Sequence, residues 1–200
     1  VFDLKLDKLV SKVTIYNPNA STKNKVYEFN KNVAKVELSS KNVESNTAIV
    51  EYKIQVSNVG KVGGYAKSVV DYLPEGMSFN ADLNKDWYIK DGNAYNTSLA
   101  NTIINPGETK EITLVLTKKV NGQNIGLFRN TAEIASEYNE QGFDDVNSVA
   151  GNKADGENDM SSADTFILIS TGKEILSITG ITVGILSIIT LGVILVKKHV

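Results

Sequence analysis

The chain has 200 residues, of which 23 are acidic and 21 basic, and it contains no cysteine. The basic residues occur singly or in pairs without an Arg-rich stripe, so the charge pattern does not predict a nucleic-acid partner. The single histidine is His199, which excludes Ser-His, Cys-His and His-ligated zinc sites from residues 1–174. We therefore expect no enzyme; the alternative left open is a site that uses carboxylates alone, such as a glycosidase pair.

Strand patterns dominate residues 1–138. Strands are predicted over 2–10, 13–16, 25–29, 34–38, 47–57, 65–72, 87–89, 94–95, 112–116 and 128–136. The pattern is clearest in 47–57, where the apolar residues from Val50 to Val56 alternate with polar ones. Turn sequences separate the strands, and Asp91-Gly92 predicts a tight hairpin. Many short strands without helical periodicity before Glu174 predict an all-β fold, an immunoglobulin-like Greek-key β-sandwich over 1–138.

Residues 139–164 break this pattern, because they contain seven acidic residues and only one basic residue, Lys153. This composition predicts a solvated loop or stalk. A calcium site is the alternative, since hard cations prefer clustered carboxylates, and its candidates are Asp155, Glu157 and Asp159. The segment does not match an EF-hand loop, and no other cofactor is expected. Residues 165–172 are expected to contain a last strand and a sorting-like sequence.

The segment 175–196 has no charged residue and predicts a single transmembrane helix, because at about 1.5 Å per residue it would span the bilayer core. The tail 197–200 contains Lys197 and Lys198, which predicts a cytoplasmic C-terminus and an extracellular domain before Glu174. That domain has a formal charge of −4 (19 − 23). An exterior domain without cysteine indicates a bacterial surface of the Gram-positive type. Since Val1 is not preceded by a signal peptide, we expect further residues upstream.

Two polar residues are predicted to face the sandwich core. In 2–10, the even positions are apolar apart from Lys8, and in 128–136 Asn130 shares its face with Phe128 and Ile134. An unpaired ammonium in a core is costly, so Lys8 must find a partner or lose its charge. Burial can lower a lysine pKa enough to give a nucleophilic amine. A Lys8–Asn130 isopeptide bond, formed with loss of ammonia, is one consequence.

Five segments together resemble the conserved-repeat surface domains of Gram-positive bacteria, which are related to collagen-adhesin A-type and pilin isopeptide domains. They are Phe2-Asp3-Leu4-Lys5-Leu6-Asp7-Lys8, Val50-Glu51-Tyr52-Lys53-Ile54-Gln55-Val56-Ser57-Asn58-Val59-Gly60, Asp71-Tyr72-Leu73-Pro74-Glu75-Gly76, Pro106-Gly107-Glu108-Thr109 and Asn130-Thr131-Ala132-Glu133-Ile134. The resemblance covers roughly residues 1–170. It implies a cross-link between Lys8 and Asn130, with Asp71 as the assisting acid.

Alternatives to this assignment remain at the level of sequence. Lys35 lies at a suitable distance before the Tyr52 strand to be the donor, and Glu51 is a rival acid, although both are predicted to lie on exposed faces. Otherwise Lys8 extends to the rim of the sandwich and Asn130 only satisfies backbone groups.

The last signals concern anchoring and ligands. Leu168, Thr171 and Gly172 resemble a Leu-Pro-x-Thr-Gly sorting signal, with Ile169 in place of proline, so the partner is either the membrane alone or also the cell wall through a sortase-type enzyme. Trp87, Tyr88 and Tyr95 could stack on a sugar ring or cover the end of the sandwich. The sequence thus predicts a surface stalk or adhesin domain; the alternative is a module that binds a host glycan or protein.

Overall fold

Eleven β-strands make up the fold in the computed structural model, which describes residues 1–21, 24–39 and 43–170. Residues 1–170 form one compact unit. The predicted transmembrane helix at 175–196, the tail 197–200, and both Thr171 and Gly172 lie outside the described residues. Within those residues, no helix has the length and apolar character needed to cross a membrane.

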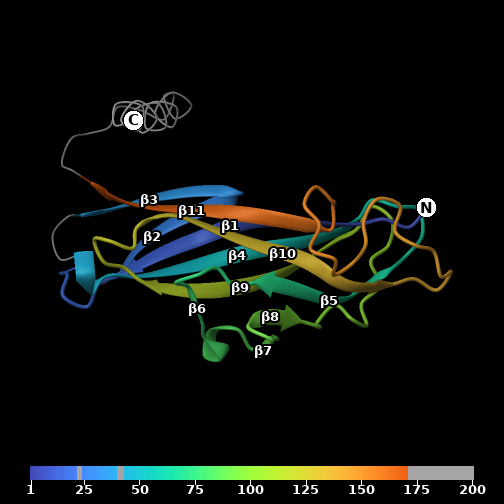
Figure 1. The fold of residues 1–200 in the computed structure, drawn as a ribbon, viewed down its shortest axis with the longest axis horizontal. Helices are drawn as coiled ribbons and strands as arrows, with labels where there is room; N and C mark the ends of the chain where they lie inside the picture. The colour runs from blue at the N-terminus through green and yellow to red at the C-terminus, as the bar shows by residue number, and fades with distance from the viewer. Residues whose placement is uncertain (22–23, 40–42, 171–200) are drawn as a thin grey trace, which may run out of the picture. The chain divides into compact units, whose positions relative to one another are not determined.

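The strands form two sheets, shown in Figure 1. The first sheet has the order β2 (Asn24–Lys31), β1 (Leu4–Tyr16), β4 (Thr47–Asn58), β9 (Thr109–Lys119) and β6 (Ser78–Phe79). The second has the order β3 (Val33–Ser39), β11 (Met160–Ser170), β10 (Gly126–Tyr138), β5 (Tyr65–Tyr72), β8 (Asn93–Asn96) and β7 (Trp87–Lys90). Two short 3₁₀ turns, Val43–Ser45 and Ala81–Leu83, are the only helical segments among the described residues. The predicted all-β fold is confirmed, and its strands form two sheets.

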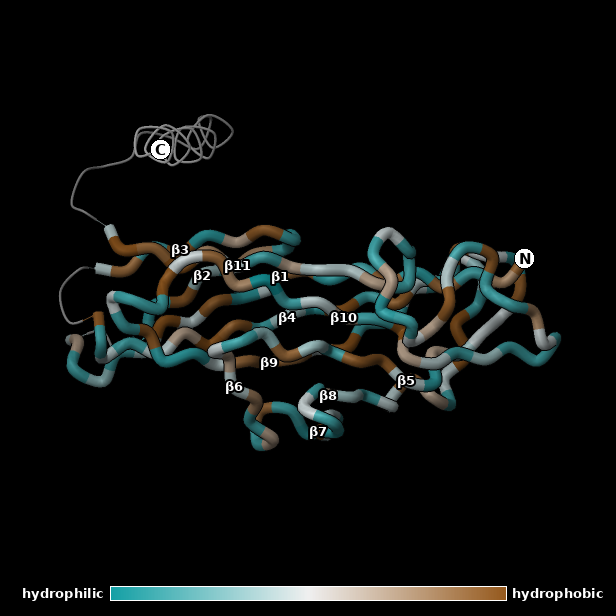
Figure 2. The backbone as a smooth tube through the Cα atoms, in the orientation of Figure 1, coloured by the Kyte–Doolittle hydropathy of each residue, from teal (hydrophilic) through white to brown (hydrophobic). Residues whose placement is uncertain are grey.

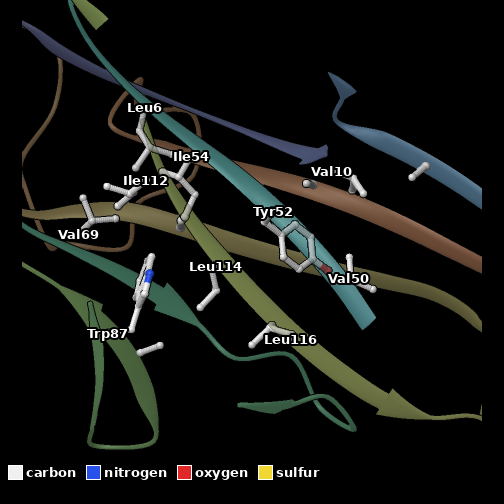
Figure 3. Close-up of a cluster of buried hydrophobic side chains, with 14 of the residues drawn as sticks. Leu6, Val10, Val50, Tyr52, Ile54, Val69, Trp87, Ile112, Leu114 and Leu116 are labelled. Carbon is white, nitrogen blue, oxygen red and sulfur yellow. The ribbon is translucent and has the colours of Figure 1, made fainter. Parts of the chain in front are cut away.

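The core lies between the sheets because every second residue of the long strands points inward. In β4, buried and half-buried residues alternate along the whole strand. Figure 2 shows hydrophobic and hydrophilic residues following one another along the tube. Figure 3 shows side chains of β1, β4 and β9, among them Leu6, Tyr52 and Leu114, meeting Val69 and Trp87 from the other sheet. The pattern predicted for 47–57 is therefore confirmed.

Residues 2–10 and 13–16, which were expected to be two strands, form the single strand β1. A bulge between Val10 and Lys12 shifts the register toward both neighbouring strands. The extra residue, Ser11, changes the parity, so that Leu6 and Val10 before it and Val13 after it all face the core. The side-chain hydroxyl of Ser11 donates to the backbone oxygen of Glu51 at 3.0 Å.

The acidic segment differs from the expected stalk in its arrangement. Strand β11 begins at Met160 rather than at 165, and it pairs with β10 on one side and in parallel with β3 on the other. The preceding residues 139–159, called the acidic end loop below, fold back onto the end of the sandwich near the N-terminus (Figure 1). There Phe2 forms a parallel bridge with Asp145, and the Leu6 amide donates to the Asn158 carbonyl at 2.9 Å. The loop is thus part of the domain.

Candidate functional site

Lys8, Asp71 and Asn130 meet in the core and are called the Lys8 cluster below. Lys8 comes from β1 in the first sheet, whereas Asp71 and Asn130 come from β5 and β10, which are neighbours in the second. Asp71 pairs across the strands with Ala132, two residues from Asn130, so Asp71 and Asn130 share the inner face. Their exposed fractions are 1 % for Lys8 and 0 % for the other two. The fold therefore brings the three predicted residues together.

The Lys8 ammonium donates to Asp71 Oδ2 in an ion pair whose side chains are fully buried. Burial lowers the pKa of Lys8, and the attraction of Asp71 only partly opposes this. Burial likewise raises the pKa of Asp71, against the opposing effect of Lys8. Both directions favour the neutral forms, an amine and a carboxylic acid, relative to what each group would adopt in water. A proton can therefore pass from Lys8 to Asp71 without leaving the pair.

Asn130 is the unusual member, because its amide nitrogen and oxygen are both buried without a hydrogen-bond partner. Asp71 Oδ1 is also unpartnered. The Asn130 amide lies close enough to lower the pKa of Asp71, but it makes no hydrogen bond of ordinary geometry. Buried amides in folded proteins are almost always paired, and an unpaired one carries a desolvation cost of about 1–3 kcal/mol. Asn130 is thus held beside a lysine and a carboxyl group without structural hydrogen bonds of its own.

Tyr52 and Thr165 complete the surroundings, and neither was predicted to belong to the site. The Lys8 Nζ atom lies 4.6 Å from the centroid of the Tyr52 ring. Burial raises the pKa of Tyr52, while its contacts with Thr165 and Asn130 act in the opposite direction. Thr165 lies diagonally across the strand pair from Asn130, and its buried hydroxyl is unpartnered. The alternation in 47–57 already placed Tyr52 inward, so its sequence signal was present.

The alternative donor and acid lie elsewhere. Lys35 is paired with Glu37 at 2.8 Å on the surface, and Glu51 is paired with Lys12 at 2.8 Å on the outer face of the first sheet. Lys8 does not extend to the rim, because its side chain is fully buried. The geometry therefore favours Lys8 and Asp71 over both rivals.

The three aromatic candidates separate into different environments. Trp87 is only 6 % exposed, packs in the core (Figure 3), and donates from Nε1 to the Thr113 carbonyl at 2.7 Å. Tyr88 is 47 % exposed and stacks on Tyr95 with ring centroids 5.9 Å apart. Trp87 is thus a structural residue, and a ligand could reach only the tyrosines.

The calcium candidates also separate. Asp155 is exposed, and both oxygens of Glu157 accept hydrogen bonds, from the Val149 amide at 3.0 Å and from Asn152 at 3.1 and 3.0 Å. Asp159 is 1 % exposed, and both of its oxygens lack a partner. Burial and neighbouring carboxylates raise its pKa to about 6. Across the part of the chain that the structure describes, no three His, Cys, Asp or Glu side chains are arranged to hold a metal ion.

Two further acidic residues of β10 were not anticipated. Glu133 is fully buried beneath the Tyr72 hydroxyl, which donates to it, and it accepts the Lys153 amide at 2.9 Å. Burial raises the pKa of Glu137 to about 8, with repulsion from Asp145 as the next cause. The Lys153 contact of Glu133 and the Asp145 repulsion on Glu137 both depend on the acidic end loop. The position of this loop has no local signal in the sequence.

Of the three sorting-like residues, only Leu168 lies within the described part of the chain. It is part of β11, where it pairs with Glu37 of β3. A sorting enzyme acting here would meet residue 168 inside a sheet, so β11 would have to open at its end for recognition.

Comparison with known proteins leaves the family open. No protein-family model and no curated protein sequence matches the chain. Among solved structures, the crystal structure of the CARDB domain of the PF1109 protein from Pyrococcus furiosus, in complex with di-metal ions, aligns with 14 % identity and a TM-score of 0.37 over 84 % of this chain and 96 % of that chain. The solution structure of the same domain aligns with 16 % identity and a TM-score of 0.36, over 84 % and 98 % of the two chains. The N-terminal domain of PorA aligns with 15 % identity and a TM-score of 0.29, over 78 % and 96 %. None of these three is named as a collagen-adhesin or pilin domain, so that resemblance stays a prediction.

Proposed function

We propose that the chain is a load-resisting surface domain of a bacterial cell, which joins Lys8 to Asn130 through an intramolecular isopeptide bond. The observation that carries the proposal is the buried Asn130 amide, which has no hydrogen-bond partner and lies beside the Lys8–Asp71 pair. The bond forms once per chain, so the domain is a self-processing structural protein rather than an enzyme with turnover.

The reaction needs no group other than the Lys8 cluster. Lys8 passes a proton to Asp71, and the neutral amine attacks the side-chain carbonyl carbon of Asn130. As the new carbon–nitrogen bond forms, Asp71 gives its proton to the departing amide nitrogen of Asn130. The original carbon–nitrogen bond then breaks, ammonia leaves, and Asp71 takes up the proton that the Lys8 nitrogen loses. Both the nucleophile and the acid arise by one proton transfer within the pair, which is why burial of the pair promotes the step.

The position of the cluster suits a domain under tension. The N-terminus and the end of β11 lie at opposite ends of the long axis of residues 1–170 (Figure 1). Force applied at these two ends enters through β1 and leaves through β11. A bond between β1 and β10 would carry that force past residues 9–129. The segment 175–196 would anchor the domain to the membrane as a single helix, with the sandwich outside the cell.

The test is the intact mass of the purified 200-residue chain. We expect the wild type to lack the mass of one ammonia, and Lys8→Met and Asn130→Ala to have their full masses. Lys35→Met is the matched control for the rival donor and keeps the deficit. Cyclisation at Asn121-Gly122 would also release ammonia, so the mass deficit alone does not identify the bond. After proteolysis, tandem mass spectrometry therefore has to find the peptide of Lys8 joined to the peptide of Asn130. A full mass in the wild type would refute the cross-link.

A second function is supported by the Tyr88–Tyr95 stack. These tyrosines lie on the β7–β8 hairpin, and Lys90 Nζ is 6.0 Å from the Tyr95 ring centroid. An exposed aromatic stack beside a cation suits a sugar ring or a host protein. Glycan-array binding that is lost in Tyr88→Ala would support this function. Trp87→Ala is not a suitable test, because it would remove a core residue.

A further inference from the structure

A second group of unpartnered polar atoms, apart from the Lys8 cluster, comes from the acidic end loop and the adjoining end of β10. Five buried oxygen atoms lack a hydrogen-bond partner: Glu137 Oε2, Ser148 Oγ, Asn158 Oδ1, and both carboxylate oxygens of Asp159. The other unpartnered buried side-chain atoms of the described residues belong to Asp71, Asn130 and Thr165 around Lys8. The loop group therefore differs in kind, because it consists of oxygen atoms alone.

The neighbouring acidic residues do not share this condition. Asp3 accepts from Asn158 Nδ2 at 2.8 Å and from Asn147 Nδ2 at 3.3 Å, and Asp145 accepts from the Leu4 amide at 2.8 Å. The oxygens of Glu133 and Glu157 are likewise used, as described above. Only Glu137 and Asp159 therefore have buried carboxylate oxygens without a donor in this region.

No positive side chain balances these two carboxylates. In residues 1–21, 24–39 and 43–170, the ion pairs join lysine or arginine to other acids, never to Glu137 or Asp159. The negative charges of Asp145 and Asp159 both raise the pKa of Glu137, and the charge of Asp145 also raises the pKa of Asp159. A negative charge in a buried site is unfavourable without a partner, so a bound cation would stabilise these carboxylates.

The oxygen donors identify the kind of cation. Calcium takes six to eight oxygen ligands in flexible geometry and accepts carboxylate, amide and hydroxyl oxygens together with water. Magnesium requires a near-ideal octahedron, which this irregular loop does not suit. Glu137, Asp145 and Ser148 line an open pocket of about 460 Å³, through which an ion and its waters can enter.

We propose that Asp159 and Glu137 bind a calcium ion between the acidic end loop and β10, with the Asn158 and Ser148 oxygens and water completing the shell. A site with two carboxylates agrees with the absence of any three-acid arrangement in the described residues. Because affinity falls as fewer charged ligands take part, the dissociation constant belongs with the extracellular modules, at about 10⁻⁴–10⁻³ M. The ion clamps the loop onto β10 and, through Asp145 and Asn158, onto the start of β1.

The experiment uses the full chain in a non-ionic detergent, stripped of metal with EDTA and then titrated with calcium chloride or magnesium chloride. We expect calcium to release heat in calorimetry and to raise the unfolding temperature, with a half-maximal effect at about 0.1–1 mM. Magnesium should have a markedly smaller effect at equal concentration.

Three variants locate the ion. Asp159→Asn and Glu137→Gln should lose the calcium-dependent shift while remaining folded, because each removes a charge from a repulsive group. Asp155→Asn is the control in the same loop and should respond like the wild type. A wild type that does not respond to calcium, or a response that persists in both Asp159→Asn and Glu137→Gln, would overturn the proposal. Circular dichroism of each variant without calcium verifies the fold.

Discussion

At the scale of single residues, the domain concentrates its unusual chemistry in Lys8, Asp71 and Asn130. A buried ion pair rarely adds stability compared with an apolar pair of the same volume, since its desolvation cost offsets the attraction. A reaction between Lys8 and Asn130 would explain why the Lys8–Asp71 pair is kept beside an amide that has no hydrogen bonds. Two predictions belong to this scale.

Replacing Asp71 with asparagine should abolish the cross-link and leave the Lys8 ammonium buried without a carboxylate. The mass should equal the full sequence mass. Stability in urea should fall below that of Asn130→Ala, which also lacks the bond but keeps the ion pair, by about 3–5 kcal/mol. Glu51→Gln, which alters the exposed rival acid, should retain the ammonia deficit. An intact cross-link in Asp71→Asn would exclude Asp71 as the proton carrier.

The rate of bond formation should show a plateau in pH with a decrease on each side. Burial lowers the pKa of Lys8 and raises the pKa of Asp71, so over a middle range the pair holds one shared proton. Below that range both groups are protonated and the amine is lost as a nucleophile. Above it, Asp71 has no proton to give to the departing amide nitrogen of Asn130. Chain made without the bond and held unfolded in urea can be refolded at each pH and followed by mass. A rate that only rises with pH would show that Lys8 titrates independently of Asp71.

At the scale of elements, the acidic end loop depends on how closely its backbone approaches β10. Gly151 has a φ of +76°, and its amide donates to the Ile134 carbonyl at 3.0 Å. A Cβ at this position would lie 2.7 Å from the Ala135 carbonyl oxygen. The glycine is therefore required both by the backbone conformation and by the contact, and the next prediction separates the two requirements.

Gly151→Ala should destabilise the domain more than Gly142→Ala. Gly142 also has a positive φ, +66°, but a Cβ there meets nothing within 4 Å. The control thus measures the conformational cost alone, about 1–2 kcal/mol, and Gly151→Ala should exceed it because of the added contact. Urea denaturation of both variants gives the difference. Equal losses would show that the loop moves away from β10 at little cost.

Sequence patterns could predict the parts of the fold that repeat along the chain, but not those that depend on distant contacts. Alternation placed Lys8 and Asn130 inward, and the family resemblance added Asp71. The bulge at Ser11 was not predicted, because Val10 and Val13 lie on opposite faces of a regular strand and share the inner face only if one residue is skipped. The hydrogen bond from the Leu4 amide to Asp145 joins segments 141 residues apart. Such distant contacts place the acidic end loop, so the sequence named Asp159 as a calcium candidate but not Glu137. For Trp87 the sequence left two roles open, stacking on a sugar ring and covering the end of the sandwich, because a short hairpin gives no indication of which face is covered.

At the scale of the whole molecule, the proposed Lys8–Asn130 cross-link would limit how far the domain can be stretched. Lys8 and Asn130 enclose 122 residues (130 − 8). By analogy with the entropy model for disulfides, closing a loop of this length stabilises the fold by roughly 4–5 kcal/mol. Under tension the mechanical effect of such a bond would be larger, because the enclosed strands could be extended only if the bond broke.

Single-molecule stretching between the ends of residues 1–170 should show this directly. At about 3.4 Å per extended residue, unfolding of the wild type should give a contour length about 40 nm shorter than unfolding of Lys8→Met. Lys35→Met should match the wild type. Equal lengths for the wild type and Lys8→Met would mean that no covalent bond links β1 to β10.

The late position of β11 in the chain also governs when the domain can fold. The Lys8 amide donates to Ser161 Oγ across 153 residues of sequence, and β3 has its partner in the same strand. Such non-local pairings make folding slow, and they require almost the entire domain to have been synthesised. If the chain is exported as proposed, a partly translated chain would remain unfolded enough to pass through a secretion channel, and the Lys8 amine would meet Asn130 only after translocation is nearly complete. The order of the strands would thus delay the proposed irreversible reaction until the polypeptide has been exported.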